Sequence, residues 1–118
     1  MPTTYGSLDK TAPELQVTEW LDTFDVARRI ADIDAPVIYL YCFQSMCPGC
    51  HVHGFPTMKA VKDHYERTGQ ADKVEFMAIQ TVFEDFERNT AEAGVTSIAH
   101  HGLDDIAVGH DVGEPQSP

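Results

Sequence analysis

Two largely apolar segments, separated by one long amphipathic stretch, constrain the fold of this chain more than any other feature. The segments are Val37–Phe43 and residues 74–83, and both are rich in β-branched and aromatic residues. Continuous runs of this kind are typical of strands that are covered on both faces of a sheet. Between them, from about residue 47 to residue 67, apolar side chains recur every three to four positions, which predicts a helix with one buried stripe. A strand, a helix and a second buried strand predict a right-handed βαβ unit with parallel strands.

Pro56 lies inside this predicted helix. Because proline has no N–H to donate and its ring clashes with the preceding turn, we expect a kink at this position. The turn-forming residues 68–70 predict the end of the helix.

Weaker patterns on both sides complete an α/β domain. They predict a short strand within residues 15–21, a short helix that begins after Thr23, a helix capped by Asn89 that runs to Ala99, and a short strand at Ile106–Val108. The polar, turn-forming ends predict a flexible arm over residues 1–13 and a disordered tail over residues 111–118. Residues 14–110 then form one domain.

The composition excludes several classes of function. The chain has 118 residues, which suits a single domain, and its net charge of −11 repels nucleic acid and anionic membrane surfaces. No apolar run approaches the roughly 20 residues that a membrane-spanning helix needs, and the first residues lack the pattern of a secretion signal. We therefore expect a cytoplasmic protein with neither a nucleic-acid partner nor a membrane partner.

The sequence Cys47-Pro48-Gly49-Cys50 stands where the first predicted strand gives way to the helix. Pro48 suits the first helical position, where its missing N–H would have had no partner, so Cys47 is expected at the N-cap. There it faces free backbone N–H groups and the positive end of the helix dipole, and both favour the reactive thiolate. Cys50 lies nearly one turn further along the same face, and a tight first turn eased by Gly49 would bring the two sulfurs within bonding distance.

This arrangement predicts thiol–disulfide exchange. Cys47 would attack a substrate disulfide, and the less exposed Cys50 would resolve the mixed disulfide that forms. His51 follows Cys47 by four positions, so its imidazolium form is a candidate for further stabilisation of the thiolate, and a solvated helix histidine is the alternative.

Other chemistries share parts of this motif. Cys47 to His51 also spells the C-x-x-C-H pattern of haem attachment, and zinc held by Cys47, Cys50, His51 or His53 is a further alternative. With Cys42 the spacing matches an iron–sulfur loop, but the fourth cysteine is absent. We expect Cys42 to be a buried small apolar residue of its strand, and His100 and His101 to be exposed near a helix end.

At these residues the chain resembles the thioredoxin-like superfamily, in particular its TlpA-like and redoxin-type thiol–disulfide oxidoreductases. Ala12-Pro13-Glu14-Leu15 resembles the Ala-Pro segment with which that branch begins. The stretch Val37–Pro56, VIYLYCFQSMCPGCHVHGFP, resembles its strand, active site and kinked helix, and residues 74–80 resemble the strand that follows. The resemblance implies a nucleophilic role for Cys47 and a resolving role for Cys50.

The chain departs from this pattern in three places. Met46 stands where the family usually has Trp, and Tyr41 stands where thioredoxins proper place a buried proton-accepting Asp. The two antiparallel strands, the cis-proline loop and the last helix of the family have no counterpart after His110. We therefore expect a thioredoxin-like βαβ core that lacks the C-terminal ββα portion and exposes one edge of the strand at Val37–Phe43.

The sequence thus predicts a thiol–disulfide oxidoreductase, working as a reductase because cytoplasmic thiols are kept reduced. Its activity is expected to be weak without the cis-proline loop. The expected partners are a disulfide-containing protein or a small thiol or disulfide. We expect the exposed strand edge to be covered by the N-terminal arm, a second copy of the chain or another protein. We expect neither a cofactor nor a metal ion. The alternative is a non-catalytic interaction or metal-binding remnant of the same fold.

Overall fold

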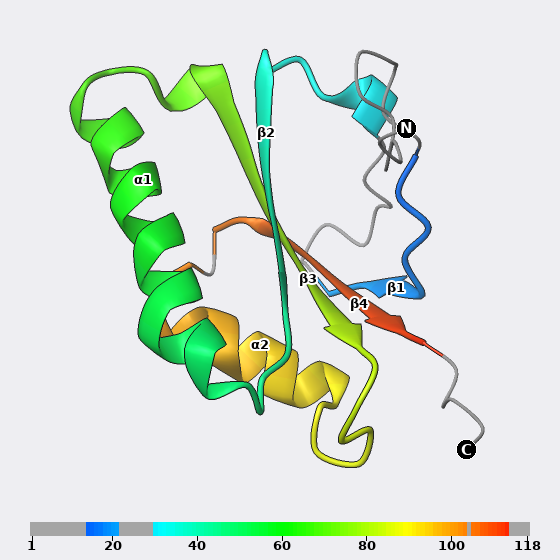
Figure 1. Cartoon of the computed structure of the whole chain (residues 1–118). Helices are drawn as coiled ribbons and strands as arrows, with labels where there is room; N and C mark the ends of the chain where they lie inside the picture. The colour runs from blue at the N-terminus through cyan, green and yellow to red at the C-terminus, as the bar shows by residue number, and fades with distance from the viewer. Residues whose placement is uncertain (1–13, 22–29, 104, 114–118) are drawn as a thin grey trace, which may run out of the picture.

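A four-stranded sheet forms the centre of the computed structural model, which describes residues 14–21, 30–103 and 105–113 (Figure 1). The strands are β1 (Glu19–Trp20), β2 (Val37–Phe43), β3 (Val74–Val82) and β4 (Ala107–Val112), and they are arranged in the order β1-β4-β3-β2. β2, β3 and β4 run parallel, whereas β1 pairs antiparallel with β4. The predicted α/β class and the parallel pairing of β2 with β3 are confirmed.

β4 is longer than the short strand predicted from the sequence. It continues through Asp111 and Val112, which the sequence assigned to a disordered tail. The extension is stabilised because Asp111 accepts hydrogen bonds from the backbone and hydroxyl of Thr18, and Val112 donates its N–H to the same hydroxyl. The predicted arm, most of the predicted helix after Thr23 and residues 114–118 lie outside the described residues.

The helical segment after β2 spans the range predicted from the sequence, and it is irregular just before Pro56, where a kink was expected. Helical conformation begins at Pro48, passes through a widened π-helical turn at Cys50–Gly54, and continues as α1 (Phe55–Arg67). Pro56 is the second residue of α1 and follows directly on the π turn, so the helical hydrogen bonding is irregular immediately before this proline. The Phe55 N–H reaches back to the Cys50 carbonyl, five residues earlier, as a π turn requires.

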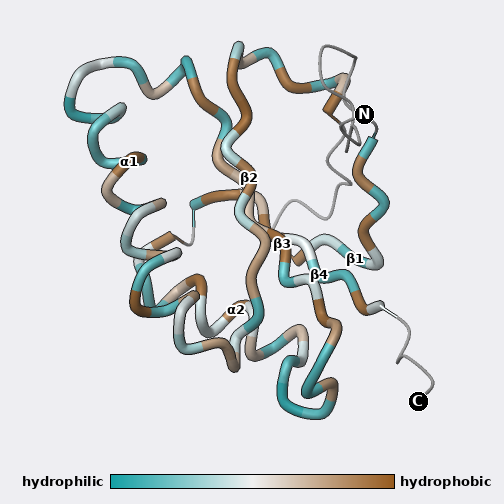
Figure 2. Tube along the Cα trace, in the orientation of Figure 1, coloured by the Kyte–Doolittle hydropathy of each residue, from teal (hydrophilic) through white to brown (hydrophobic). Residues whose placement is uncertain are grey.

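One hydrophobic core lies between the sheet and the helices α1 and α2 (Ala91–His100), which both pack on the same face of the sheet (Figure 1). Phe55 and Met58 of α1 and Ile98 of α2 belong to this core together with Phe43 and Phe76 from the strands. β3 is buried along most of its length, as its continuous apolar sequence predicts. In Figure 2 the loop between β3 and α2 is mostly hydrophilic, whereas apolar residues gather along the strands.

The sequence predicted that β2 would be covered on both faces, and the structure differs. Among the described residues it is the edge strand of the sheet, because it pairs with β3 alone. Val37, Leu40 and Cys42 are exposed, so the prediction of a buried Cys42 is wrong. The expectation of an uncovered edge on this strand agrees with the described structure.

Within the described residues, no helix has both the length and the apolar character needed to cross a membrane.

Candidate dithiol site

Cys47 and Cys50 lie just beyond the carboxyl end of β2, where the loop of residues 44–46 leads into the first helical turn. Helical conformation begins directly after Cys47, as predicted from Pro48. Both cysteines are free thiols and both are partly exposed. The site therefore presents two accessible cysteines, three positions apart, at a helix start.

Hydrogen bonds favour the thiolate of Cys47. The side chain of Cys50, its backbone N–H and the N–H of Gly49 lower the pKa of Cys47, while partial burial and the nearby Glu84 carboxylate act in the opposite sense. Because these donors come from the first helical turn, the predicted stabilisation by the helix start has a structural basis.

Gly49 was expected to ease a tight first turn, and its backbone there is ordinary. Its φ of −63° and ψ of −31° are ordinary helical values that any residue adopts. A Cβ built on Gly49 would lie 4.0 Å from the Cys47 sulfur, which is normal van der Waals contact. The close approach of Cys47 and Cys50 thus depends on the hydrogen-bonded turn, in which the Cys50 N–H donates to the Cys47 carbonyl over 3.1 Å.

His51 forms contacts that the sequence did not suggest. Its Nε2 lies 2.7 Å from the Ser45 carbonyl oxygen, and its Nδ1 lies 2.9 Å from Nε2 of His101. Because a carbonyl only accepts, neutral His51 carries its proton on Nε2, and its Nδ1 accepts from His101. No hydrogen bond among the described residues joins His51 to Cys47, so stabilisation of the thiolate by His51 stays a prediction.

His101 is half-buried, in contrast to the exposed position expected for it. Its ring stacks on Phe55 with a centroid separation of 4.4 Å and an interplanar angle of 11°. Burial, followed by the proximity of His51 and His100, lowers the pKa of His101. The hydrogen bond between His51 and His101 therefore joins the end of α2 to the π turn.

Tyr41 contacts the backbone of the turn that carries Cys50. Its hydroxyl donates to the Cys50 carbonyl over 3.3 Å, and burial, followed by the hydrogen bond to Cys50, raises its pKa. The hydroxyl fits there because residue 54 is glycine, since a Cβ built on Gly54 would lie 1.8 Å from the Tyr41 oxygen. A tyrosine with a raised pKa stays protonated at neutral pH, so Tyr41 supplies a hydrogen-bond donor and not a base.

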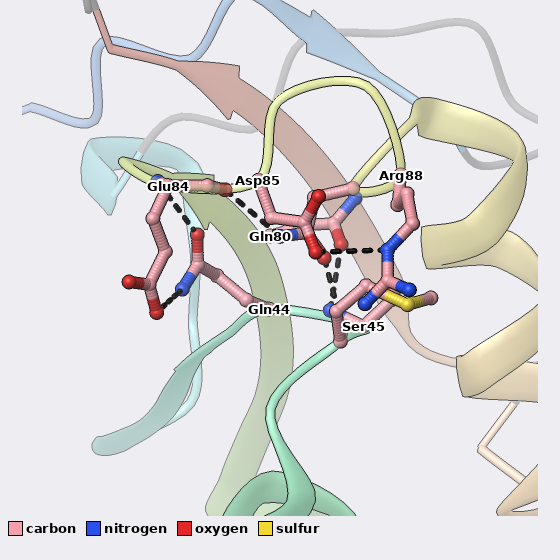
Figure 3. A network of polar contacts seen from close by, with 8 residues as sticks. Gln44, Ser45, Gln80, Glu84, Asp85 and Arg88 are labelled. Carbon is pink, nitrogen blue, oxygen red and sulfur yellow. Dashed lines mark hydrogen bonds and ion pairs between the residues drawn. The ribbon is translucent and has the colours of Figure 1, made fainter.

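A network of buried amide side chains surrounds the loop that precedes Cys47 (Figure 3). Gln80 of β3 accepts the Ser45 N–H over 2.8 Å, and Gln44 accepts the N–H groups of Phe83 and Glu84. Asn89 accepts the Met46 N–H over 2.9 Å, so Asn89 is not the predicted cap of α2. That cap is Thr90, whose hydroxyl accepts from the Ala93 N–H.

Sequence reasoning missed these residues because their partners lie far along the chain. One signal was present, since Gln80 is a polar residue within a largely apolar strand and a buried amide needs partners.

The alternative metal site gains no support from the geometry. Within the residues that the structure describes, no three His, Cys, Asp or Glu side chains gather closely enough to hold a metal ion. The side chains of His51 and His101 bond to each other and do not converge on the dithiol.

Two solved structures are similar to this chain. One is a thioredoxin-like superfamily protein, with a TM-score of 0.73 and 31% sequence identity, matched over 90% of this chain and 66% of that one. The other is a thiol-disulfide isomerase from Corynebacterium glutamicum, with a TM-score of 0.67 and 27% identity, matched over 86% of this chain and 63% of the isomerase. The chain thus spans just under two thirds of the length of each. No family model and no curated protein sequence matches it.

Proposed function

This chain has a thioredoxin-like fold, and on that premise we propose that it is a thiol–disulfide oxidoreductase of the TlpA-like kind in which Cys47 and Cys50 carry the electrons. The observation that carries the proposal is the placement of Cys47 and Cys50, two accessible cysteines within one turn at the start of a helix, just beyond the carboxyl end of β2. A thiol whose pKa is lowered and that has a second thiol beside it is suited to disulfide exchange.

The proposed reaction has two exchange steps. The Cys47 thiolate attacks one sulfur of a substrate disulfide, a Cys47–substrate disulfide forms, and the second substrate sulfur leaves as a thiolate that takes a proton from water. Cys50 then loses its proton to solvent and attacks the Cys47 sulfur, which closes the Cys47–Cys50 disulfide and releases the remaining substrate thiolate. The substrate gains two electrons, the dithiol loses two, and an external thiol reductant must restore it.

Two neighbours have supporting roles in this proposal. Tyr41 holds the carbonyl of Cys50 and so fixes the resolving cysteine, but with a raised pKa it does not replace the proton-accepting Asp of thioredoxins. Solvent is therefore the proposed proton acceptor for Cys50. Pro48 starts the helix whose N–H groups face Cys47.

We propose net disulfide reduction as the direction, with a disulfide-bearing protein or a small disulfide as substrate and a cytoplasmic setting. The hydrogen bonds that favour the Cys47 thiolate stabilise the reduced dithiol and therefore act against this direction. The reduction potential consequently decides whether the dithiol donates or accepts electrons.

A turnover assay with single-cysteine variants tests the proposal. The wild-type chain should reduce a chromogenic aromatic disulfide in the presence of dithiothreitol faster than dithiothreitol alone. Cys47→Ser should remove this activity, and Cys50→Ser should accumulate a mixed disulfide at Cys47 that mass spectrometry detects. Cys42→Ser is the matched control, because Cys42 is an exposed thiol on β2 outside the helix start, and it should retain wild-type activity. Equal background rates for all four proteins would refute the proposal.

A further inference from the structure

The loop of residues 44–46 has no strand or helix to satisfy its backbone, yet side chains hold its polar groups. The Ser45 N–H donates to Gln80 Oε1 over 2.8 Å, and the Met46 N–H donates to Asn89 Oδ1 over 2.9 Å. The Ser45 carbonyl accepts from His51, and the Gln44 carbonyl accepts from the Cys47 N–H over 3.1 Å. Hydrogen bonds to successive peptide groups therefore hold the segment immediately before Cys47 in place.

Gln80 is itself held in one orientation. It is 0% exposed, and its Nε2 donates to the Thr90 carbonyl over 2.8 Å and to Nδ1 of His110 over 3.1 Å. With both donors used, the amide cannot flip without losing two hydrogen bonds, so its oxygen stays directed at Ser45. β3, β4 and the start of α2 thus jointly define where the loop lies.

Asn89 holds the next peptide in the same way. It is 2% exposed, its Nδ2 donates to the Glu84 carbonyl over 3.0 Å, and its own N–H donates to the Asp85 carbonyl. A residue of the loop before Cys47 also bonds to the loop after β3, because Gln44 Oε1 accepts hydrogen bonds from the N–H groups of Phe83 and Glu84 (Figure 3). The loop before Cys47 and the loop after β3 therefore form one cross-bonded unit.

We propose that Gln80 and Asn89 are positioning residues of the dithiol, which hold the loop so that the Cys47 sulfur stays over the N–H groups of the first helical turn. The inference rests on the proposed function. Buried amides are retained only where hydrogen bonds offset the cost of removing them from water, and here two such amides are each bonded to a loop peptide. Neither residue touches a reacting sulfur, so their effect on Cys47 acts through the loop.

The test compares Gln80→Met and Asn89→Leu with the wild-type chain. Both replacements keep the side-chain size and remove the hydrogen-bonding groups. The readout is the rate of iodoacetamide reaction at Cys47 against pH, followed on the Cys47 peptide by mass spectrometry. The midpoint is the pH at which the Cys47 alkylation rate reaches half its plateau. We expect it to rise by about 1 pH unit in each variant, so that at a pH below the midpoints of variant and wild type the variant reacts roughly tenfold more slowly.

Two controls separate positioning from stability. Gln70→Met makes the first replacement at an exposed glutamine and should leave the profile unchanged. Ile98→Val weakens the core without touching the loop and should lower the melting temperature with the Cys47 midpoint unchanged. If Gln80→Met and Asn89→Leu fold and keep the wild-type midpoint, the positioning role is refuted.

A measurement on the wild-type chain keeps the inference testable if the variants do not fold. Hydrogen exchange should show the Ser45 and Met46 amides protected, although neither lies in a strand or helix. Rapid exchange of both amides beside a reactive Cys47 would overturn the positioning role alone. A wild-type Cys47 that reacts no faster than a free cysteine would instead overturn the proposed function, and this inference with it.

Discussion

Cys47 and Cys42 lie only five positions apart, but their surroundings change their acidity in opposite directions. Hydrogen bonds from Cys50 and from the Gly49 N–H lower the pKa of Cys47, whereas partial removal from water raises the pKa of Cys42, although much of its side chain is exposed. At neutral pH we therefore expect iodoacetamide to modify Cys47 before Cys42, and the Cys47 rate to reach its plateau at lower pH. Peptide mass spectrometry of a time course measures both rates, and equal rates at the two cysteines would contradict the expectation.

The lowered pKa also makes the stability of the reduced chain depend on pH. Because Cys47 is more acidic in the folded chain than in the unfolded chain, its ionisation stabilises the folded form above the unfolded pKa. This contribution is lost as the pH falls through the folded pKa. Cys47→Ser should remove that part of the pH dependence, which urea unfolding of the reduced proteins at several pH values would measure.

Gly54 makes room for the Tyr41 hydroxyl, whose oxygen lies 1.8 Å from the place where a Cβ would be. We expect Gly54→Ala to displace Tyr41 and to cost about 1–3 kcal/mol of unfolding free energy, as overpacking does. Gly49→Ala is the matched control, because its backbone is helical and its Cβ would meet ordinary contacts, so it should leave stability unchanged or raise it slightly. Urea unfolding of both variants is the measurement, and an equal effect of the two substitutions would count against the described packing.

At the residue scale, the sequence predicted the helix-start position of Cys47 because a local pattern sets it: a strand, then Cys-Pro, then a helix. The partners of the loop could not be predicted in this way. Gln80 and Asn89 contact residues 35 and 43 positions earlier, and His101 contacts His51 from 50 positions away. Such contacts depend on how β3 and α2 are placed against β2, which no local periodicity determines.

At the scale of elements, an ion pair joins α1 to the segment before β4. Lys62 is 7% exposed, and its ammonium lies 2.7 Å from Asp105 and 2.5 Å from Glu66. Burial opposes the charge of Asp105, but the Lys62 ammonium outweighs it and lowers the pKa of that carboxyl. The contact fixes the end of α1 that is remote from the dithiol.

We expect Asp105→Asn to cost roughly 1 kcal/mol or less, because the Asp105 side chain is 61% exposed and water screens the pair. Since the folded pKa of Asp105 is depressed, its stabilisation is present above the unfolded pKa and is lost as the pH falls through the folded pKa. The difference in stability between wild type and variant should therefore disappear in acid. Thermal unfolding between neutral and acidic pH measures it, and a difference that persists in acid would contradict the assignment.

The elements themselves were largely predictable, and their ends were not. β2, β3 and the amphipathic helix follow directly from apolar periodicity. The π turn before Pro56 and the extension of β4 through Val112 both depend on tertiary contacts, namely Tyr41 against Gly54 and Thr18 against Asp111. Element type thus follows from local pattern here, whereas element boundaries follow from packing.

At the scale of the whole molecule, the free edge of β2 is the feature with the largest consequence. Backbone groups on its outer side have no partner strand among the described residues, and Val37 and Leu40 are exposed beside them. Such an edge is a template for pairing with another strand. We expect it to be covered in solution by the N-terminal arm, a second copy of the chain or another protein.

Size-exclusion chromatography with light scattering tests this expectation. Self-association that Leu40→Lys abolishes, with the exposed Val95→Lys on α2 as the control, would assign the edge to a second copy. A well-folded monomer whose N-terminal arm is disordered would show that neither the arm nor a second copy covers the edge. The sequence predicted that the edge would be uncovered, but its composition holds no information on what would cover it.

The most direct test of the redox assignment is equilibration of the chain with glutathione buffers of graded potential, followed by acid quenching and mass spectrometry of the cysteine peptides. The assignment predicts a reversible two-electron transition in which Cys47 and Cys50 become linked to each other while Cys42 stays a free thiol. A midpoint more reducing than that of the glutathione pool would support the reductase direction. Cys47 and Cys50 that remain unlinked across the whole range would contradict the central claim.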